Sequence, residues 1–222
     1  APLPPEIHRQ FEKRFSIPII ETMGLTETGA QILSNPLPPE IRKIGSPGVA
    51  YGNEVIVGDD NQNPVAANVE GEILVRGSNV MQGYLDLPEE TAKTITAEGW
   101  LRTGDLGRMD EDGFVFVTGR IKELIIKGGE NIAPREVDEA LLEHNAVLEA
   151  AAFPRACKDY GQRVEACVCL KKGHNTDENE LREFCKNLIG AYKTPDRIYF
   201  LDDLPKGPSG KVQRMKLVDL TL

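Results

Sequence analysis

The sequence lacks the features of three large classes of protein. None of its apolar runs comes near the ~18 residues that a membrane-spanning helix needs, so a membrane span is excluded. Acidic residues outnumber basic ones by 35 to 26, which gives a formal charge of −9. Without a basic stripe, such a chain is a poor partner for nucleic acid or anionic lipid. The three histidines, His8, His144 and His174, are scattered, and a zinc site built from them is not expected.

Cysteine is scarce as well. The four cysteines form no C-x-x-C pair. Cys167 and Cys169 lie two residues apart in an expected strand, which favours small apolar core residues in a reducing compartment. We see no secretion signal and expect a cytoplasmic protein, because no charged segment followed by an apolar stretch opens the chain. Residues 1–5, A-P-L-P-P, have no methionine, which we interpret as the start of a fragment.

What is present indicates a globular protein of 222 residues with ample material for a core, 40% of them hydrophobic and 27% charged. Apolar residues at four-residue spacing predict a short helix over residues 5–15. From residue 18 to about 117, short β-type runs lie between glycines and prolines, for example at 54–57, 72–75 and 114–117. These runs predict a small barrel or sandwich, interrupted by one helix from Pro88.

The pattern changes near residue 120. Strands are expected at residues 123–126, 164–170 and 197–201. One helix is expected to begin at Pro134, another to be capped by Thr176, and a last short helix to follow a Gly/Pro loop. The fold class expected from these elements is α+β, with a compact second domain after the boundary.

The first segment that needs a chemical explanation is M-G-L-T-E-T-G at residues 23–29. Glycines on both sides of Thr26 and Glu27 let the backbone come close to a ligand. The Thr26 hydroxyl can donate to a phosphate, and the Glu27 carboxylate can hold a hard divalent cation. The alternative is a turn with a surface glutamate.

The second segment is W-L-R-T-G-D-L at residues 100–106. An ionised Asp105 held at a tight Thr-Gly turn accepts two hydrogen bonds, which suits the vicinal hydroxyls of a ribose. The alternative is an ordinary aspartate in a hairpin turn.

The third segment is G-R-I-K-E at residues 119–123, followed closely by K-G-G-E-N at 127–131. Arg120 and Lys122 lie at the expected domain boundary, where two cations can act on a ligand held between domains or simply belong to a linker. The glycine pair permits a loop that approaches a substrate closely.

The fourth segment is P-K-G-P-S-G-K at residues 205–211. It is not a P-loop, because Val212 follows Lys211 where Ser or Thr is required and the glycine spacing differs. A lysine on a mobile Gly/Pro loop can neutralise the charge that develops in phosphoryl or nucleotidyl transfer. A solvated loop lysine is the alternative.

The order of these motifs is more specific than any one of them. Thr-Glu, then G-E-I-L-V-R-G at residues 71–77, R-T-G-D, G-R-I-K and P-K-G-P-S-G-K closely resemble the later core motifs of the acyl-adenylate-forming superfamily. That superfamily includes acyl-CoA synthetases, coumarate-CoA ligases, luciferases and peptide-synthetase adenylation domains. The resemblance covers nearly the whole chain and implies ATP/AMP, Mg²⁺ and coenzyme A as cofactors and a small carboxylic acid as substrate.

The resemblance also implies roles for single residues. Thr26 would contact phosphate and Glu27 would help to hold Mg²⁺. Asp105 would accept the ribose hydroxyls with Arg120 beside it. Lys211 would stabilise charge in the adenylation step, the role that its chemistry indicated independently.

Other roles follow from the same resemblance. Thr22, Met23 and Gly24 would belong to the nucleotide site, with Met23 in the place of the aromatic residue that commonly stacks on adenine. Asn131 would reach the nucleotide. Lys122 would be the hinge about which the small domain rotates, and Lys127, Gly128 and Gly129 would line the tunnel by which the thiol enters.

One large departure from the family is an absence, since its upstream phosphate loop and most of its acyl pocket are missing. We therefore interpret residues 1–120 as the end of the large domain, mostly its distorted β-barrel part, and residues 121–222 as the mobile small domain. The chain alone is expected to be inactive without the missing N-terminal portion.

The function expected is that of a fragment of a carboxylate-CoA ligase, whose acid the sequence does not name. Two alternatives stay open at this point. One is an adenylation protein that loads the phosphopantetheine of a carrier protein. The other is a non-catalytic nucleotide-binding or interaction module.

Overall fold

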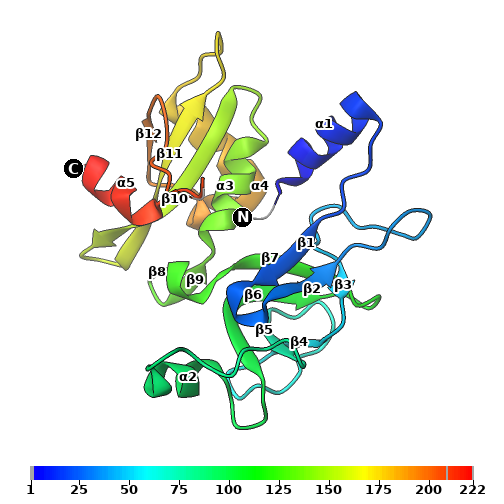
Figure 1. Ribbon diagram of the computed structural model, residues 1–222. Helices are drawn as coiled ribbons and strands as arrows, with labels where there is room; N and C mark the ends of the chain where they lie inside the picture. The colour runs from blue at the N-terminus through cyan, green and yellow to red at the C-terminus, as the bar shows by residue number, and fades with distance from the viewer. Residues whose placement is uncertain (1–2, 209, 222) are drawn as a thin grey trace. The chain divides into compact units, whose positions relative to one another are not determined.

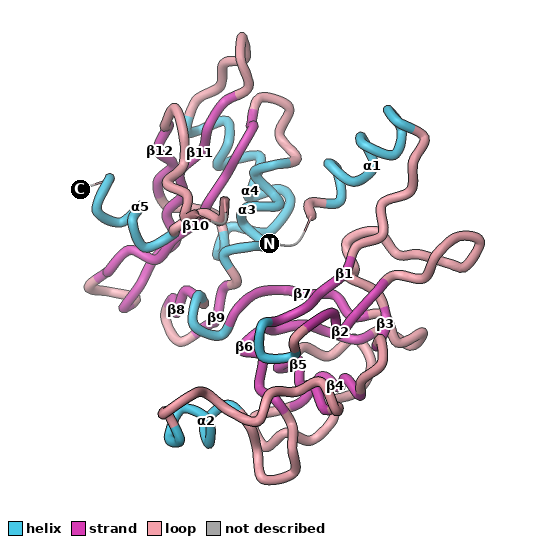
Figure 2. Tube along the Cα trace, viewed as in Figure 1, coloured by secondary structure: helices cyan, strands magenta, loops and turns pink. Residues whose placement is uncertain are grey.

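The computed structural model describes residues 3–208 and 210–221, which have a mixed α+β fold (Figures 1 and 2). The backbone divides into two compact units, the first ending at Ile121 and the second beginning at Lys122. Each unit has its own hydrophobic core and is described by itself. None of the helices in the described ranges combines the length and apolar character needed to cross a membrane.

The first unit consists of antiparallel sheets and two helices, α1 (Pro5–Phe15) and α2 (Pro88–Thr94). One sheet has the order β1-β2-β3, with strands Thr22–Leu25, Ala30–Ser34 and Val49–Ala50. The other has the order β4-β5-β6-β7, with strands Glu54–Gly58, Gly71–Arg76, Leu101–Met109 and Val115–Arg120.

The two sheets of the first unit share one core. The inner strand β5 has hydrogen-bonded neighbours on both sides and its residues Ile73, Leu74 and Val75 are fully buried, as expected for a continuous apolar run. Both sheets contribute to a single cluster of buried side chains, namely Ile32, Leu33, Val55, Ile73, Val75, Leu101 and Val115. The short apolar runs therefore predicted this part of the fold correctly.

Strand β6 differs from the expectation. The sequence predicts a tight Thr-Gly turn here, whereas the structure has one continuous strand with a bulge. Gly104 has φ +71°, and the pairing with β5 shifts register between Glu72 and Leu74. The Glu72 carboxylate accepts a hydrogen bond from the Gly104 amide (3.0 Å). Because this partner lies 32 residues away, the local pattern gave no sign of the bulge.

The second unit is one sheet covered by helices. Its helices are α3 (Pro134–Leu142), α4 (Glu178–Lys193) and α5 (Arg214–Leu220). The sheet has the order β10-β11-β8-β9, and β12 pairs with β11 in parallel. The strands are β8 (Ile125–Lys127), β9 (Glu130–Ile132), β10 (Val147–Cys157), β11 (Gly161–Leu170) and β12 (Arg197–Phe200).

Side chains of β11 alternate between two cores. Val164, Ala166 and Val168 pack with the apolar residues of α3 and α4, whereas Cys167 and Cys169 pack with Leu217 of α5. This is the period of two that a strand imposes when both faces of its sheet are covered. The expectation that these two cysteines share one side of a strand and are small core residues is confirmed.

Strand β10 and the cap of α4 differ from the prediction. Strand β10 reads V-L-E-A-A-A-F-P-R-A-C, and its alanines and Pro154 have low strand propensity. Proline is accepted there because β10 pairs only with β11 in the described sheet and is thus an edge strand. Helix α4 is capped by Asp177, whose Oδ1 accepts from the Glu180 amide (2.9 Å), and not by Thr176.

The cysteines give a first testable prediction. Burial raises the pKa of the Cys167 thiol to about 12 and that of Cys185 to about 11, and Cys169 is also buried. Only Cys157, which is partly exposed, should react with iodoacetamide at pH 8 in the native protein. Peptide mapping by mass spectrometry should find the other three labelled only after denaturation. Rapid labelling of Cys167 in the native state would contradict the burial.

Candidate active site

The Thr-Glu segment is a rigid turn between two strands. Thr26–Thr28 forms a single 3₁₀ turn, η1, between β1 and β2. Thr28 is fully buried, and its hydroxyl donates to the Leu25 carbonyl (2.9 Å) or to the Ala30 carbonyl (2.8 Å). The buried hydroxyl fixes the backbone on which the Thr26 side chain is exposed and that of Glu27 is half-buried.

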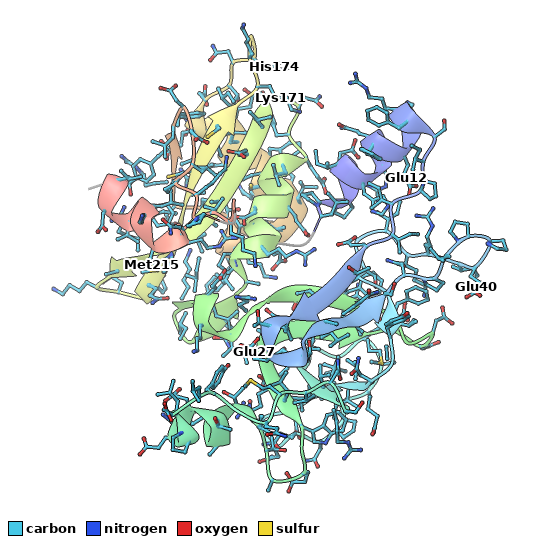
Figure 3. The ribbon with its side chains drawn as sticks, in the orientation of Figure 1. Glu12, Glu27, Glu40, Lys171, His174 and Met215 are labelled. Atoms are coloured by element: carbon cyan, nitrogen blue, oxygen red, sulfur yellow. The ribbon has the colours of Figure 1, made fainter. Side chains whose placement is uncertain are left out.

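A second segment holds η1 from residues 79–84. The Met81 amide donates to the Glu27 carbonyl (2.8 Å), and the Asn79 side-chain amide donates to the Thr28 carbonyl (3.0 Å). The Tyr84 hydroxyl donates to Oε1 of Glu27 (2.9 Å). Burial, together with this hydrogen bond, raises the pKa of Tyr84, so the phenol keeps its proton and acts as the donor. Figure 3 labels Glu27 on its turn.

The residues before this turn have structural reasons for their identities. Thr22 is exposed on β1, while the half-buried Met23 packs against the core of the first unit. A Cβ at Gly24 would lie 2.8 Å from the Ala30 carbonyl oxygen, so the close approach of β1 to β2 requires glycine. The neighbouring strand therefore accounts for this glycine, which the sequence pattern had related to the close approach of a ligand.

Asp105 lies in the bulge of β6 and is buried. Its side chain is 6% exposed, and its Oδ1 accepts from Nε of Arg120 (2.8 Å), the residue opposite it on β7. The Asp105 amide donates to Oγ1 of Thr103 (3.0 Å). An aspartate in this environment is not the exposed hairpin-turn residue of the alternative interpretation. The bulge positions the carboxylate, and the Arg120 guanidinium gives it a charge-assisted hydrogen bond.

In the second unit, the glycine pair is the turn of a hairpin. Gly128 and Gly129 join β8 to β9 with φ +56° and +90°, and two positive φ angles are what a two-residue type I′ turn requires. A Cβ at Gly128 would lie 3.1 Å from the Tyr192 hydroxyl and 3.2 Å from the ring of Tyr160. Asn131 follows on β9 with its side chain exposed.

Lys127 precedes this turn, and its side chain contacts the end of α4 and the segment that follows it. Lys127 is buried, and its Nζ donates to the Tyr192 carbonyl (3.1 Å) and lies 3.4 Å from Oδ2 of Asp196. The Tyr192 hydroxyl in turn donates to the Lys127 carbonyl. The Lys127 ammonium therefore links the β8–β9 hairpin to the end of α4. Lys122 lies at the boundary of the units and is exposed.

Two lysines of the Gly/Pro loop have different environments. Lys206 forms ion pairs with Glu149 (2.8 Å) and Asp203 (3.0 Å), and these hydrogen bonds raise its pKa to about 12. Lys211 is exposed, and its carbonyl accepts from the Gly207 amide (2.8 Å). Ser209 of this motif lies outside the described residues. Lys206 thus has a structural role, and Lys211 presents its ammonium to solvent.

Two residues near the candidates, Tyr84 and Arg214, have no signal in the local sequence, and Tyr84 contacts a candidate directly. Tyr84 lies 57 residues from Glu27, and no local pattern marks it. Arg214 is the first residue of α5, three residues after Lys211, and donates to Asp138 (2.5 Å), to the Ala152 carbonyl (2.9 Å) and to Glu123 (3.2 Å).

Comparison with known proteins identifies the family. A model described as AMP-binding enzyme matches residues 1–85, and one described as AMP-binding enzyme C-terminal domain matches residues 136–211. A sulfoacetate–CoA ligase of Cupriavidus necator is 52% identical over 219 residues, which is 99% of this chain and 43% of that protein. An oxalate–CoA ligase of Saccharomyces cerevisiae is 41% identical over 218 residues, 98% of this chain and 40% of that protein.

A solved structure agrees with both. ATP-bound MatB from Rhodopseudomonas palustris has a TM-score of 0.93 at 33% identity, covering 100% of this chain and 45% of that protein. The chain thus spans less than half the length of the relatives it matches. The two family models together match well over half of it, in the order that its motifs predicted. The chain belongs to the AMP-binding enzymes, the acyl-adenylate-forming superfamily.

Proposed function

We propose that this chain is the C-terminal part of an ATP-dependent carboxylate–CoA ligase, which activates an acid as its acyl-adenylate and transfers the acyl group to coenzyme A. The observation that supports it most is the buried Asp105 held by Arg120 on the β6 bulge, within a chain that is 52% identical to a sulfoacetate–CoA ligase. Residues 1–120 would be the end of the large domain. Residues 121–222 would be the mobile small domain, with Lys122 as its hinge.

The first half-reaction joins the acid to the nucleotide. A carboxylate oxygen attacks the α-phosphorus of ATP, an oxygen–phosphorus bond forms, and the bond to pyrophosphate breaks. The exposed Thr26 hydroxyl would donate to a phosphate oxygen, and Asp105 would accept hydrogen bonds from the ribose hydroxyls. Lys211 would be brought to the phosphate, where its ammonium stabilises the negative charge that develops. Thr22, Met23, Gly24 and Asn131 would border the nucleotide.

The second half-reaction transfers the acyl group. The thiol sulfur attacks the acyl carbon, a thioester forms, and AMP leaves with the electrons of the broken acyl–oxygen bond. The Gly128–Gly129 turn would border the path of the thiol, because without side chains it leaves room for a narrow chain. Lys127 would act from behind the turn, holding the hairpin to α4 through Tyr192.

The donor set fits a magnesium ion held jointly with the nucleotide. Among the described residues no group of three or more acidic, histidine or cysteine side chains could hold a metal alone. Mg²⁺ is usually bound by one or two carboxylates together with substrate phosphates, and Glu27 offers one such carboxylate beside the exposed hydroxyl of Thr26. When bound, the ion would neutralise charge on the phosphates.

Two further points belong to this proposal. A reducing compartment such as the cytoplasm suits four cysteines that are all free thiols. Coenzyme A is preferred to a carrier protein as the acceptor, because relatives at 52% and 41% identity are named CoA ligases. A non-catalytic module is not favoured, because the same relatives are named as enzymes.

The test is carboxylate-dependent ATP–pyrophosphate exchange by the whole protein and by this chain alone. The acids should include sulfoacetate, oxalate and 2-succinylbenzoate, with coenzyme A thioester formation measured in parallel. Exchange only in the whole protein, followed by release of a CoA thioester, is the expected result. Adenylation without acceptance of coenzyme A would favour a carrier-protein substrate, and no nucleotide turnover with any acid would overturn the proposal.

Asp105→Asn is expected to raise the KM for ATP by about 10- to 100-fold, because a hydrogen bond to a charged group contributes about 1.5–3 kcal/mol. The asparagine side chain keeps the shape of the aspartate but lacks its negative charge. Arg120 pairs with that charge, and the ribose hydroxyls would donate to it. Asp60→Asn, at an exposed position of the same unit, is the matched control. An unchanged KM for ATP with an unchanged melting temperature would remove Asp105 from the nucleotide site.

A further inference from the structure

A tyrosine far from the Thr-Glu motif in sequence contacts its carboxylate directly. Tyr84 is half-buried, and its hydroxyl lies 2.9 Å from Oε1 of Glu27. It is separated from Glu27 by most of the first unit's strands, so only the fold brings the two together. The inference below rests on the proposed role of Glu27 and concerns how that carboxylate is aimed.

The backbone of Tyr84 is fixed to helix α2. Its amide donates to Oγ1 of Thr91 (2.9 Å), and its carbonyl accepts from the Leu87 amide (3.2 Å). The Thr91 hydroxyl also donates to the Leu87 carbonyl (2.9 Å). A Cβ at Gly83 would lie 2.8 Å from the Thr91 side chain, so the loop lies directly on the helix. These contacts hold the backbone of Tyr84 in place against α2, so the position of its phenol is restricted as well.

The same segment also holds the backbone of the turn. Met81 donates to the Glu27 carbonyl at 2.8 Å, and Asn79 donates to the Thr28 carbonyl at 3.0 Å. The backbone of η1 would thus stay in place without the phenol. What the Tyr84 hydroxyl adds is the orientation of the Glu27 carboxylate alone.

A carboxylate that accepts one fixed hydrogen bond has its remaining lone pairs aimed in set directions. Carboxylates that bind metals are commonly held in this way, and loss of the outer partner typically weakens metal binding by about 10- to 100-fold. We propose that Tyr84 is a positioning residue that orients Glu27 toward a divalent cation bound together with ATP. It does not contact the reacting atoms itself.

Tyr84→Phe in the whole protein removes the hydroxyl and keeps the ring. Mn²⁺ binding should be followed by electron paramagnetic resonance in the presence of α,β-methylene-ATP, which does not turn over. The Kd for Mn²⁺ should rise about 10-fold or more. The Mg²⁺ concentration that half-saturates pyrophosphate exchange should rise in parallel, with the rate at saturating Mg²⁺ largely restored. Tyr51→Phe, at a tyrosine that is 61% exposed, should change neither quantity.

A double-mutant cycle with Glu27→Gln separates the possible results. If the phenol acts through the carboxylate, Tyr84→Phe should add little in the Glu27→Gln background. If Glu27→Gln leaves Mn²⁺ binding unchanged, the proposed role of Glu27 fails. If Glu27→Gln weakens binding and Tyr84→Phe does not, or if the two effects are additive, the role of Tyr84 is overturned while that of Glu27 stands. A lower melting temperature without a change in Mn²⁺ affinity would show a purely structural role.

Discussion

Replacing Lys211 with alanine in the whole protein should lower the rate of acyl-adenylate formation by about 10²- to 10³-fold, because a preorganised charge at the transferring phosphate is worth that much. Thioester formation from preformed acyl-adenylate should be retained. The ammonium is exposed on a loop between β12 and α5 and is free to meet a phosphate, unlike that of Lys206, which is bound by Glu149 and Asp203.

The two half-reactions should be measured separately, by pyrophosphate exchange and by CoA-dependent consumption of added acyl-adenylate. Lys216→Ala is a suitable control, because Lys216 is exposed on α5 in the same unit. Equal loss of both half-reactions in Lys211→Ala would contradict a role confined to adenylation. Equal loss in the control would instead show that the C-terminal helix is sensitive to any change.

Local pattern was sufficient where an element's own residues determine it. Strands β4 and β5 are short apolar runs between turn residues, and α1 begins at the proline that predicted it. The family was recognised from the order of motifs, which does not require any knowledge of how they pack. Each element and each single motif lies within a few residues along the chain, so both can be read without the fold.

Local pattern failed where a distant partner decides the structure. The β6 bulge depends on Glu72, and the edge position of β10 allows Pro154 within a strand. The burial of Lys127 against Tyr192, which lies 65 residues further on, has no counterpart in the local sequence. These features come from pairing and packing across the unit, and a scan of neighbouring residues does not contain them.

The candidate site shows the same difference between residues that the local sequence predicts and residues that only the fold brings together. Sequence identified the groups with evident chemistry, namely Glu27, Asp105, Arg120 and Lys211. It did not identify Tyr84 or Arg214, which act on those groups or on their support through the fold. A residue that positions another side chain is recognised by its place in the fold. The sequence around such a residue therefore gives little indication of its role.

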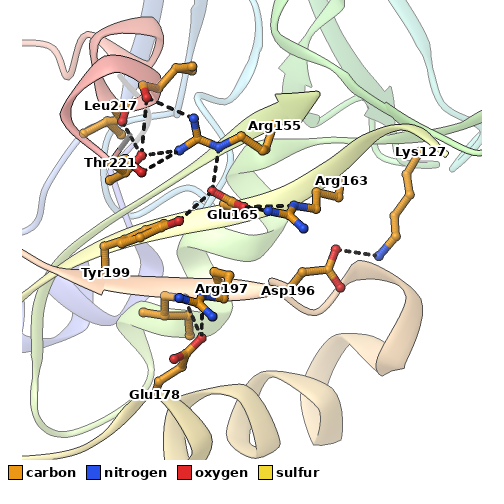
Figure 4. Close-up of polar contacts among 12 residues, drawn as sticks. Lys127, Arg155, Arg163, Glu165, Glu178, Asp196, Arg197, Tyr199, Leu217 and Thr221 are labelled. Carbon is orange, nitrogen blue, oxygen red and sulfur yellow. Dashed lines mark hydrogen bonds and ion pairs between the residues drawn. The ribbon is translucent and has the colours of Figure 1, made fainter. Parts of the chain in front are cut away.

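A buried ionic network in the second unit leads to the largest stability effect that we expect. Glu165 is fully buried in β11. It accepts hydrogen bonds from Arg155 (2.8 Å), Arg163 (2.9 Å) and the Tyr199 hydroxyl (3.1 Å), which Figure 4 shows as dashed lines. Arg155 also donates to the Val218 carbonyl of α5 (3.0 Å). One carboxylate thus connects three strands and the helix that follows the Lys211 loop.

Glu165→Ala should destabilise the second unit by about 3–5 kcal/mol, because it leaves the guanidinium of Arg155, whose side chain is only 13% exposed, without its counter-charge. Hydrogen exchange of the β11 amides in the whole protein measures the change locally, without assuming that both units unfold together. Glu183→Ala, which removes an exposed pair with Lys186, should cost less than about 1 kcal/mol.

Replacing both partners distinguishes two causes of lost stability, namely loss of the ion-pair attraction and the cost of leaving one charge without its partner. Arg155→Met combined with Glu165→Leu removes the ion pair without leaving either charge of that pair buried, and should recover much of the stability lost in Glu165→Ala. It also removes the bond from Arg155 to the end of α5, so adenylation, which depends on the loop just before that helix, should remain impaired. Recovery of stability together with full adenylation would show that the network serves stability alone. Recovery of stability without adenylation would show that Arg155 also positions α5 for the reaction.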